Sequence, residues 1–146
     1  FQALVEFRSG ATGVLEGSKV ALGSLNRLEL EVNGTDGSIR FNMERMNELE
    51  VCFRKEEGSS LAGFRQVNVT NVGHPFATNW WPRHPLGWDQ TFVHELAHLL
   101  GAIAGDAHIA PYGATFEDGY RAAVICDAIA ASADTDSRVS IDYAQE

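Results

Sequence analysis

The sequence predicts an α+β fold, with an open, mostly antiparallel β-sheet and helices packed on one of its faces. Two observations indicate this class: short segments of alternating polarity fill the first half of the chain, and two long helical segments follow in the second half. Strands and helices that are segregated along the chain are typical of α+β architectures. We expect the 146 residues to form one domain, since a domain takes roughly 100–200 residues.

Six strands are expected in the first half, separated by residues that favour turns. They are 1–7, 13–20, 25–32, 38–42, 49–53 and 64–70. The third alternates strictly, with Leu28, Leu30 and Val32 on one side and Arg27, Glu29 and Glu31 on the other. This alternation predicts a half-buried antiparallel strand with one polar face. Residues 43–47 are expected to form a helical turn.

Two helices are expected in the second half. Asp89 can cap the first helix, which runs to Ala104 and stops at Gly105. Thr115 and Asp118 have the spacing of a capping box and would begin a second helix of about 18 residues. That helix is expected to end near residue 133, and residues 137–143 are expected to form a final strand.

The segment 71–88 differs from the rest, because it holds three Trp, three Pro and two His residues. Proline interrupts periodic structure, and the segment is long for a connection without elements of its own. Long ordered loops often carry function. A functional loop and a structural aromatic plug are both compatible with this composition.

The charge balance excludes one class of partner. Eleven Lys and Arg residues against 20 Asp and Glu give a net charge of −9, so a generic nucleic-acid binder is not expected. No apolar run approaches the roughly 20 residues of a membrane span. Cys52 and Cys126 lie in apolar segments, which favours two buried, reduced thiols and a cytoplasmic setting over a disulfide. The first residues already form a predicted strand, so we expect a piece of a longer polypeptide.

One motif suggests a metal. His94, Glu95 and His98 form HELAH, an HExxH pattern in which two His one helical turn apart bind zinc and the Glu acts as general base. The extended pattern would place a third ligand at Ala104, which has no donor atom. Glu117 is another candidate ligand, but an acidic residue in the first turn of a helix also favours the helix dipole. A solvated or subunit-facing polar stripe opposite the apolar face of the helix also explains both His residues, and it is the interpretation that the sequence favours.

Six segments, taken in order, are similar to the C-terminal domain of the Gfo/Idh/MocA oxidoreductases, the relatives of glucose-fructose oxidoreductase and inositol dehydrogenase. The segments are 7–18, 31–41, 44–51 (ERMNELEV), 80–82 (WWP), 92–95 (FVHE) and 115–122 (TFEDGYRA). Together they extend over nearly the whole chain. A resemblance in the same order along the sequence is stronger than a single five-residue motif.

The resemblance implies a parent enzyme that uses NAD or NADP to oxidise a sugar, a cyclitol or a sugar derivative. The family's Rossmann domain, its Glu-Lys-Pro motif and its Asp-x-x-x-His pair have no counterpart in these 146 residues. We therefore expect no catalytic, cofactor-binding or metal-binding residue in this chain, and no activity of the chain alone. The family also implies a homo-oligomer formed through a face of the sheet.

Four residues are predicted to contact the substrate. Ser24 and Asn26 match positions where inositol dehydrogenase relatives carry a substrate-facing Tyr, and small polar side chains can hydrogen-bond sugar hydroxyls. Trp81 and His84 lie in the aromatic loop, where a flat ring suits the apolar face of a pyranose. A surface pair at a strand end and packing beneath the loop are the alternatives for these two pairs.

Two other functions remain open from the sequence. One is a zinc metallopeptidase-like domain built on His94, Glu95 and His98, and the other is a non-catalytic module for self-association. Metal content separates the first from the oxidoreductase hypothesis. A small-molecule sugar or polyol, with no nucleic acid and no membrane, is the expected partner of the full-length enzyme.

Overall fold

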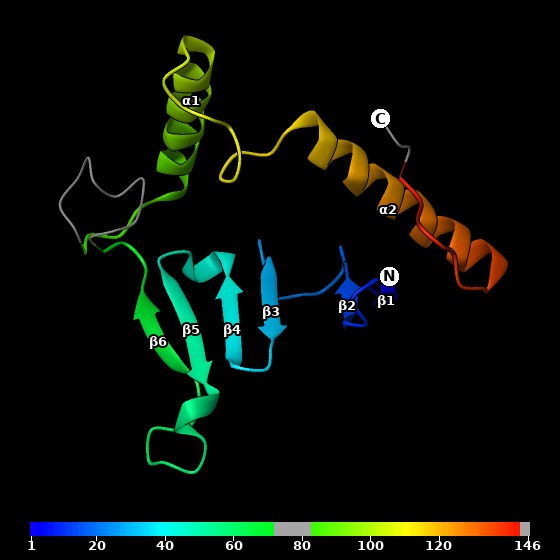
Figure 1. The fold of residues 1–146 in the computed structure, drawn as a ribbon, viewed down its shortest axis with the longest axis horizontal. Helices are drawn as coiled ribbons and strands as arrows, with labels where there is room; N and C mark the ends of the chain where they lie inside the picture. The colour runs from blue at the N-terminus through cyan, green and yellow to red at the C-terminus, as the bar shows by residue number, and fades with distance from the viewer. Residues whose placement is uncertain (72–82, 144–146) are drawn as a thin grey trace. The chain divides into compact units, whose positions relative to one another are not determined.

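The computed structural model describes residues 1–71 and 83–143, which belong to two compact units. Residues 1–21 and 95–146 make the hairpin unit, and residues 22–94 make the sheet unit. The described strands are all antiparallel and two α-helices follow them, which confirms the α+β class (Figure 1).

The hairpin unit begins with β1 (Gln2–Glu6) and β2 (Thr12–Glu16), which pair in antiparallel register. Gly10 turns the chain between them with a φ of +86°, which glycine adopts without strain. The expected strand 13–20 therefore ends early. Its pairing stops at Glu16 because the opposite residue, Gln2, is the first of β1.

The expected final strand at 137–143 is wrong: within the described part of the chain, no β-ladder includes these residues. The segment is attached to the hairpin by side chains instead of by backbone hydrogen bonds. Arg138 pairs with Glu6 at 3.2 Å, and Arg8 pairs with Asp142 at 3.5 Å. Both ion pairs are solvent-exposed, so each contributes little to stability, and neither requires extended, ladder-forming geometry.

The sheet unit contains four strands in the order β3-β4-β5-β6, so the described strands form two sheets and not one of six strands. The bounds are β3 Glu29–Asn33, β4 Gly37–Asn42, β5 Glu48–Phe53 and β6 Arg65–Asn68, with 3₁₀ turns η1 Met43–Arg45 and η2 Arg54–Glu56 around β5. The turn at 43–47 is thereby confirmed as helical. A Cβ at Gly37 would lie 2.2 Å from the Cys52 carbonyl oxygen, so only glycine fits there.

The sheet has one polar and one apolar face, as the alternation predicted. The register places Glu31 opposite Arg40, and Arg40 opposite Glu50 on the next strand. The intervening residues make the apolar face, which in this chain stays open to solvent. Exposed fractions on it are 60% for Leu30, 52% for Val32, 47% for Ile39 and 43% for Val67.

The two helices match the expectation closely. Helix α1 covers Trp88–Ala104 and stops at Gly105, whose φ is +85°. It starts at Trp88, one residue before Asp89, so Asp89 lies in the first turn and is not the N-cap. The N–H of Gly87, the residue before the helix, donates to the Gln90 side chain.

Helix α2 covers Phe116–Thr135 and ends at Asp136 in the left-handed region. Thr115 and Asp118 form the predicted capping box, with both reciprocal hydrogen bonds present. The helix continues two residues beyond the expected end.

Cys126 on this helix is exposed and Cys52 partly exposed, so the thiols are free as expected but not buried. In the described residues, no helix is both long and apolar enough to cross a membrane.

The capping box predicts a pH dependence of helix stability. The side-chain hydroxyl and the backbone N–H of Thr115 donate to the Asp118 carboxylate at 2.7 and 2.8 Å, and these hydrogen bonds lower the pKa of Asp118. A carboxyl whose pKa is lowered by folding stabilises the fold above its unfolded pKa, and that contribution is lost as the pH falls through the folded pKa.

We therefore expect the variant Asp118→Asn to lose helical stability near neutral pH and to match the unmodified chain at strongly acidic pH. Urea unfolding followed by circular dichroism over a pH series measures this difference. Asp127→Asn, a substitution in the middle of α2, is the matched control and should show no such convergence. A stability difference that stays constant with pH would contradict the assignment.

Candidate functional site

The predicted substrate-contacting residues lie at one end of the four-stranded sheet. Strand β3 begins, β4 ends, β5 begins and β6 ends at this end, which we call the η1 end because η1 joins β4 to β5 there (Figure 1). Ser24 and Asn26 lie in the segment that enters β3, and His84 lies in the segment that leads to α1. Trp81 lies outside the described residues.

Glu44 holds the first of these segments. Its Oε1 accepts hydrogen bonds from the backbone N–H groups of Leu25 and Asn26, at 3.2 and 3.1 Å. The Glu44 N–H in turn donates to the Asn42 side chain at 2.8 Å, which caps η1. Hydrogen bonds to a charged acceptor are stronger than neutral ones. Strand β3 starts at Glu29 because the opposite residue, Asn42, is the last of β4. Before that point, Glu44 takes the place of a strand partner for the N–H groups of residues 25 and 26.

Asn47 holds the second segment. Its Nδ2 donates to the Leu86 carbonyl at 2.9 Å, and its Oδ1 accepts from the Leu86 N–H at 2.7 Å. The side-chain amide thus pairs with both backbone groups of one residue, as a neighbouring strand would. The Asn47 carbonyl also accepts from the Val69 N–H at 3.0 Å. The start of β5, the end of β6 and the chain before α1 are joined through this one asparagine.

A second anchor lies on the other side of His84. The Arg83 N–H donates to the Thr70 carbonyl at 2.6 Å, and Thr70 is only 4% exposed. Both the N–H and the hydroxyl of Thr70 donate to Asn68 Oδ1, at 2.9 and 2.7 Å. Arg83 has a φ of 72°, a conformation that costs a non-glycine residue about 1–2 kcal/mol and that the surrounding contacts must sustain. The backbone around His84 is therefore fixed on both sides.

These anchors present polar side chains on a fixed backbone. Asn26 and His84 are exposed and Ser24 is partly exposed, so an amide, an imidazole and a hydroxyl group lie at or near the surface. Such groups donate and accept hydrogen bonds, as recognition of sugar hydroxyls requires. Three of the four predicted residues thus lie on segments that share the η1 end of the sheet.

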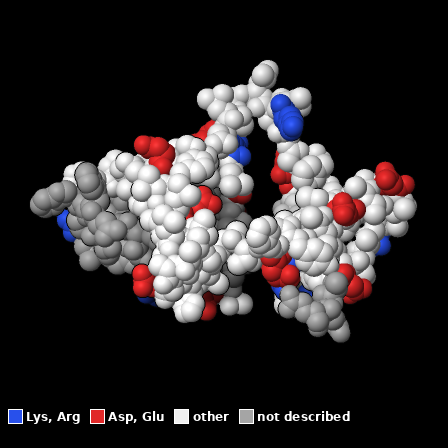
Figure 2. All heavy atoms as spheres, turned by 90° about the horizontal axis from the view of Figure 1, so that it is seen from above, with Lys and Arg blue, Asp and Glu red and all other residues white. Residues whose placement is uncertain are grey.

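The polar face of the sheet is organised around Arg40. Its guanidinium donates to Glu31 at 2.7 Å and lies 3.8 Å from the centre of the Phe64 ring. The hydrogen bond from Arg40, and a second from Asn33, lower the pKa of Glu31. Acidic side chains are dispersed over the surface that Figure 2 displays and do not gather in one patch.

The HELAH segment lies in α1. His98 Nε2 lies 2.7 Å from the His108 carbonyl oxygen, which can only accept, so Nε2 is the donor and the lone pair of the neutral ring is on Nδ1. Glu117 pairs with Arg121 at 2.6 Å. Within residues 1–71 and 83–143, no three His, Cys, Asp or Glu side chains are grouped for metal binding.

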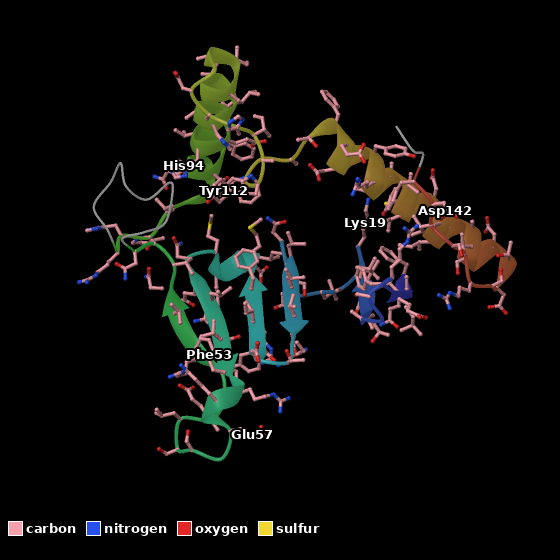
Figure 3. The ribbon with its side chains drawn as sticks, viewed as in Figure 1. Lys19, Phe53, Glu57, His94, Tyr112 and Asp142 are labelled. Carbon is pink, nitrogen blue, oxygen red and sulfur yellow. The ribbon has the colours of Figure 1, made fainter. Side chains whose placement is uncertain are left out.

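The expected solvated stripe on α1 is also only partly correct. His94 and His98 are both partly buried, and the ring of His98 lies 6.4 Å from that of Tyr112 (labelled with His94 in Figure 3). The loop after α1 therefore packs against His98.

Sequence reasoning missed Glu44, Asn47 and Thr70. The first two are in the ERMNELEV segment, which contributed to the family resemblance but not to the choice of site residues. Their partners lie 18 to 39 residues away in sequence. The available signal was polar residues in a turn between two strands, a pattern that is common and not specific.

Comparisons with known proteins agree with this fold. Residues 1–141 match the family model described as "Oxidoreductase family, C-terminal alpha/beta domain" of the Gfo/Idh/MocA type. The chain is 37% identical over 140 residues to levoglucosan dehydrogenase of Pseudarthrobacter phenanthrenivorans, which covers 94% of this chain but 35% of that protein.

Solved structures give the same result. A levoglucosan dehydrogenase in complex with NADH and levoglucosan superposes with a TM-score of 0.85 at 35% identity, over 98% of this chain and 38% of that one. An oxidoreductase domain protein from Kribbella flavida superposes with a TM-score of 0.84 at 34% identity, over 96% of this chain and 36% of that one. The chain thus spans little more than a third of each relative.

The two hydrogen bonds of Asn47 should make a measurable contribution to the free energy of unfolding. Asn47→Ala removes two partly buried hydrogen bonds to Leu86 and should lower the free energy of unfolding by about 2 kcal/mol, since each net contribution is about 1 kcal/mol. Urea unfolding gives the value. Asn33→Ala is the matched control: it also removes two side-chain hydrogen bonds, to Glu31 and Ser38, but both are exposed, so it should change stability less. Equal losses in the two variants would show that Asn47 is no special anchor.

Proposed function

This chain belongs to the family of Gfo/Idh/MocA oxidoreductase C-terminal domains, and we propose that it is the substrate-binding domain of an NAD(P)-dependent dehydrogenase of a sugar, cyclitol or sugar derivative. The observation that carries this proposal is the match over 98% of the chain to levoglucosan dehydrogenase with NADH and a sugar bound. A second structure of levoglucosan dehydrogenase, in complex with NADH and L-sorbose, matches with a TM-score of 0.86.

The role of this chain in the reaction is to bind and orient the polyol. Ser24, Asn26 and His84 supply hydrogen-bonding groups on a backbone that Glu44 and Asn47 hold, and we assign Trp81 to the same site. Fixed donors and acceptors orient the carbon to be oxidised and reduce the entropic cost of the reactive geometry. The cofactor, when bound, accepts a hydride from that carbon while the hydroxyl proton passes to a base.

We infer that the chain is inactive alone. Its sequence contains no glycine-rich dinucleotide fingerprint, so the nicotinamide cofactor would be held by a separate part of the enzyme. Its span of little more than a third of each relative agrees with this division of labour. Two free cysteines support a reducing compartment, and we place the enzyme in the cytoplasm.

A fusion enzyme tests the proposed function. Residues 1–141 of this chain would replace the matching region of levoglucosan dehydrogenase of Pseudarthrobacter phenanthrenivorans. NADH formation would then be followed with levoglucosan, L-sorbose, a cyclitol and, as a non-sugar control, ethanol. We expect turnover of at least one sugar or cyclitol, none of ethanol, and none by the 146-residue chain alone.

The fusion has its own controls. Intact levoglucosan dehydrogenase shows that the assay works, and NADH binding by the fusion shows that its cofactor domain is folded. Within the fusion, Asn26→Ala should raise the KM for the sugar more than Ser59→Ala, which lies in the loop after η2. A fusion that binds NADH but oxidises no polyol would contradict the proposal.

We also propose that the enzyme is a homo-oligomer formed through a face of the four-stranded sheet. The open apolar side chains of Leu30, Val32 and Ile39 support this, because large exposed apolar surfaces mark interaction sites or cause aggregation. Light scattering of the fusion enzyme should give a dimer or larger assembly, and Val32→Glu should reduce its mass. A monodisperse monomer would contradict this part of the proposal.

A further inference from the structure

The turn at residues 42–47 contacts both substrate-facing segments through side chains that reach only their backbone. Glu44 accepts from the N–H groups of Leu25 and Asn26, and Asn47 pairs with both backbone groups of Leu86. One short turn therefore fixes two segments that are about 60 residues apart in the chain. This shared anchor sets the distance between the polar side chains that the two segments carry.

The segment that Glu44 holds lies just beyond the β-ladder. Strand β4 ends at Asn42, opposite Glu29, and η1 follows it, although the Met43 N–H still donates to the Leu28 carbonyl at 2.9 Å. For the N–H groups of residues 25 and 26, the Glu44 carboxylate takes the place of a strand partner. Since the backbone sets the direction of its side chains, loss of these two hydrogen bonds would re-aim Ser24 and Asn26.

We propose that Glu44 is a positioning residue for the sugar: it fixes the backbone of residues 25 and 26 beyond the end of the β-ladder and so directs Ser24 and Asn26 toward the substrate. This inference rests on the proposed function. Glu44 itself acts through the backbone of its neighbours. The Asn47–Leu86 pair performs the matching task for His84, so the two anchors define the two sides of one polyol site.

The test uses the fusion enzyme and three variants. Glu44→Ala removes the acceptor, whereas Glu44→Gln keeps an oxygen that can accept from the two N–H groups. Glu57→Ala removes an exposed glutamate that pairs with Arg54, in the loop that follows η2 at the opposite end of the sheet (Figure 3). We expect Glu44→Ala to raise the KM for the sugar roughly fivefold to tenfold, with kcat and the KM for NAD unchanged.

Glu44→Gln should restore most of the lost affinity, and Glu57→Ala should behave like the unmodified fusion. Hydrogen exchange followed by mass spectrometry gives an independent readout: peptides that include Leu25 and Asn26 should exchange differently in Glu44→Ala alone. A merely structural role would lower stability and affect the sugar and NAD constants together, without selective rescue by Gln.

The outcomes separate this inference from the proposed function. If the unmodified fusion oxidises no polyol, the proposed function fails and the inference fails with it. If the fusion is active but Glu44→Ala retains its KM for the sugar, or loses sugar and cofactor affinity equally, only the positioning role of Glu44 is wrong. A selective, Gln-rescued rise in the sugar KM supports both.

Discussion

The η1 end of the sheet depends on one constraint: backbone N–H and C=O groups that leave a β-ladder must find other partners. At this end β3 and β5 begin and β4 and β6 end, so several such groups would otherwise be unsatisfied. Side chains from the turn between β4 and β5 provide the partners. Asn47 replaces a missing strand for Leu86, and Glu44 does the same for Leu25 and Asn26. The geometry of the candidate site follows from this substitution.

Local signals in the sequence predicted most of the elements. The capping box at Thr115, the stop at Gly105 and the alternation through β3 each depend on neighbours within a few residues, and the structure contains all three. The resemblance to the oxidoreductase family then supplied the expected function and the predicted substrate-contacting positions. Periodicity and capping predict elements reliably because the interactions behind them join residues that are close in the sequence.

The sequence failed wherever a distant partner decided the outcome. Residues 137–143 have the composition of a strand but contact the hairpin through the ion pairs of Arg138 and Asp142. His98 was expected on a solvated or subunit-facing stripe, yet its ring is partly buried and its nitrogen bonds to the carbonyl of His108. Glu44 was not among the predicted site residues, because its two backbone partners lie 18 and 19 residues away in the sequence. In each case the competing interaction involves a residue that no local pattern identifies.

The anchors at the η1 end contact only main-chain atoms of residues 25, 26 and 86. These hydrogen bonds therefore do not depend on which side chains occupy positions 24, 26 and 84. Those side chains can be exchanged while the backbone that carries them keeps its course. Under the proposed function, such exchanges would change the preferred polyol, and the same three positions are the starting points for redesigning specificity.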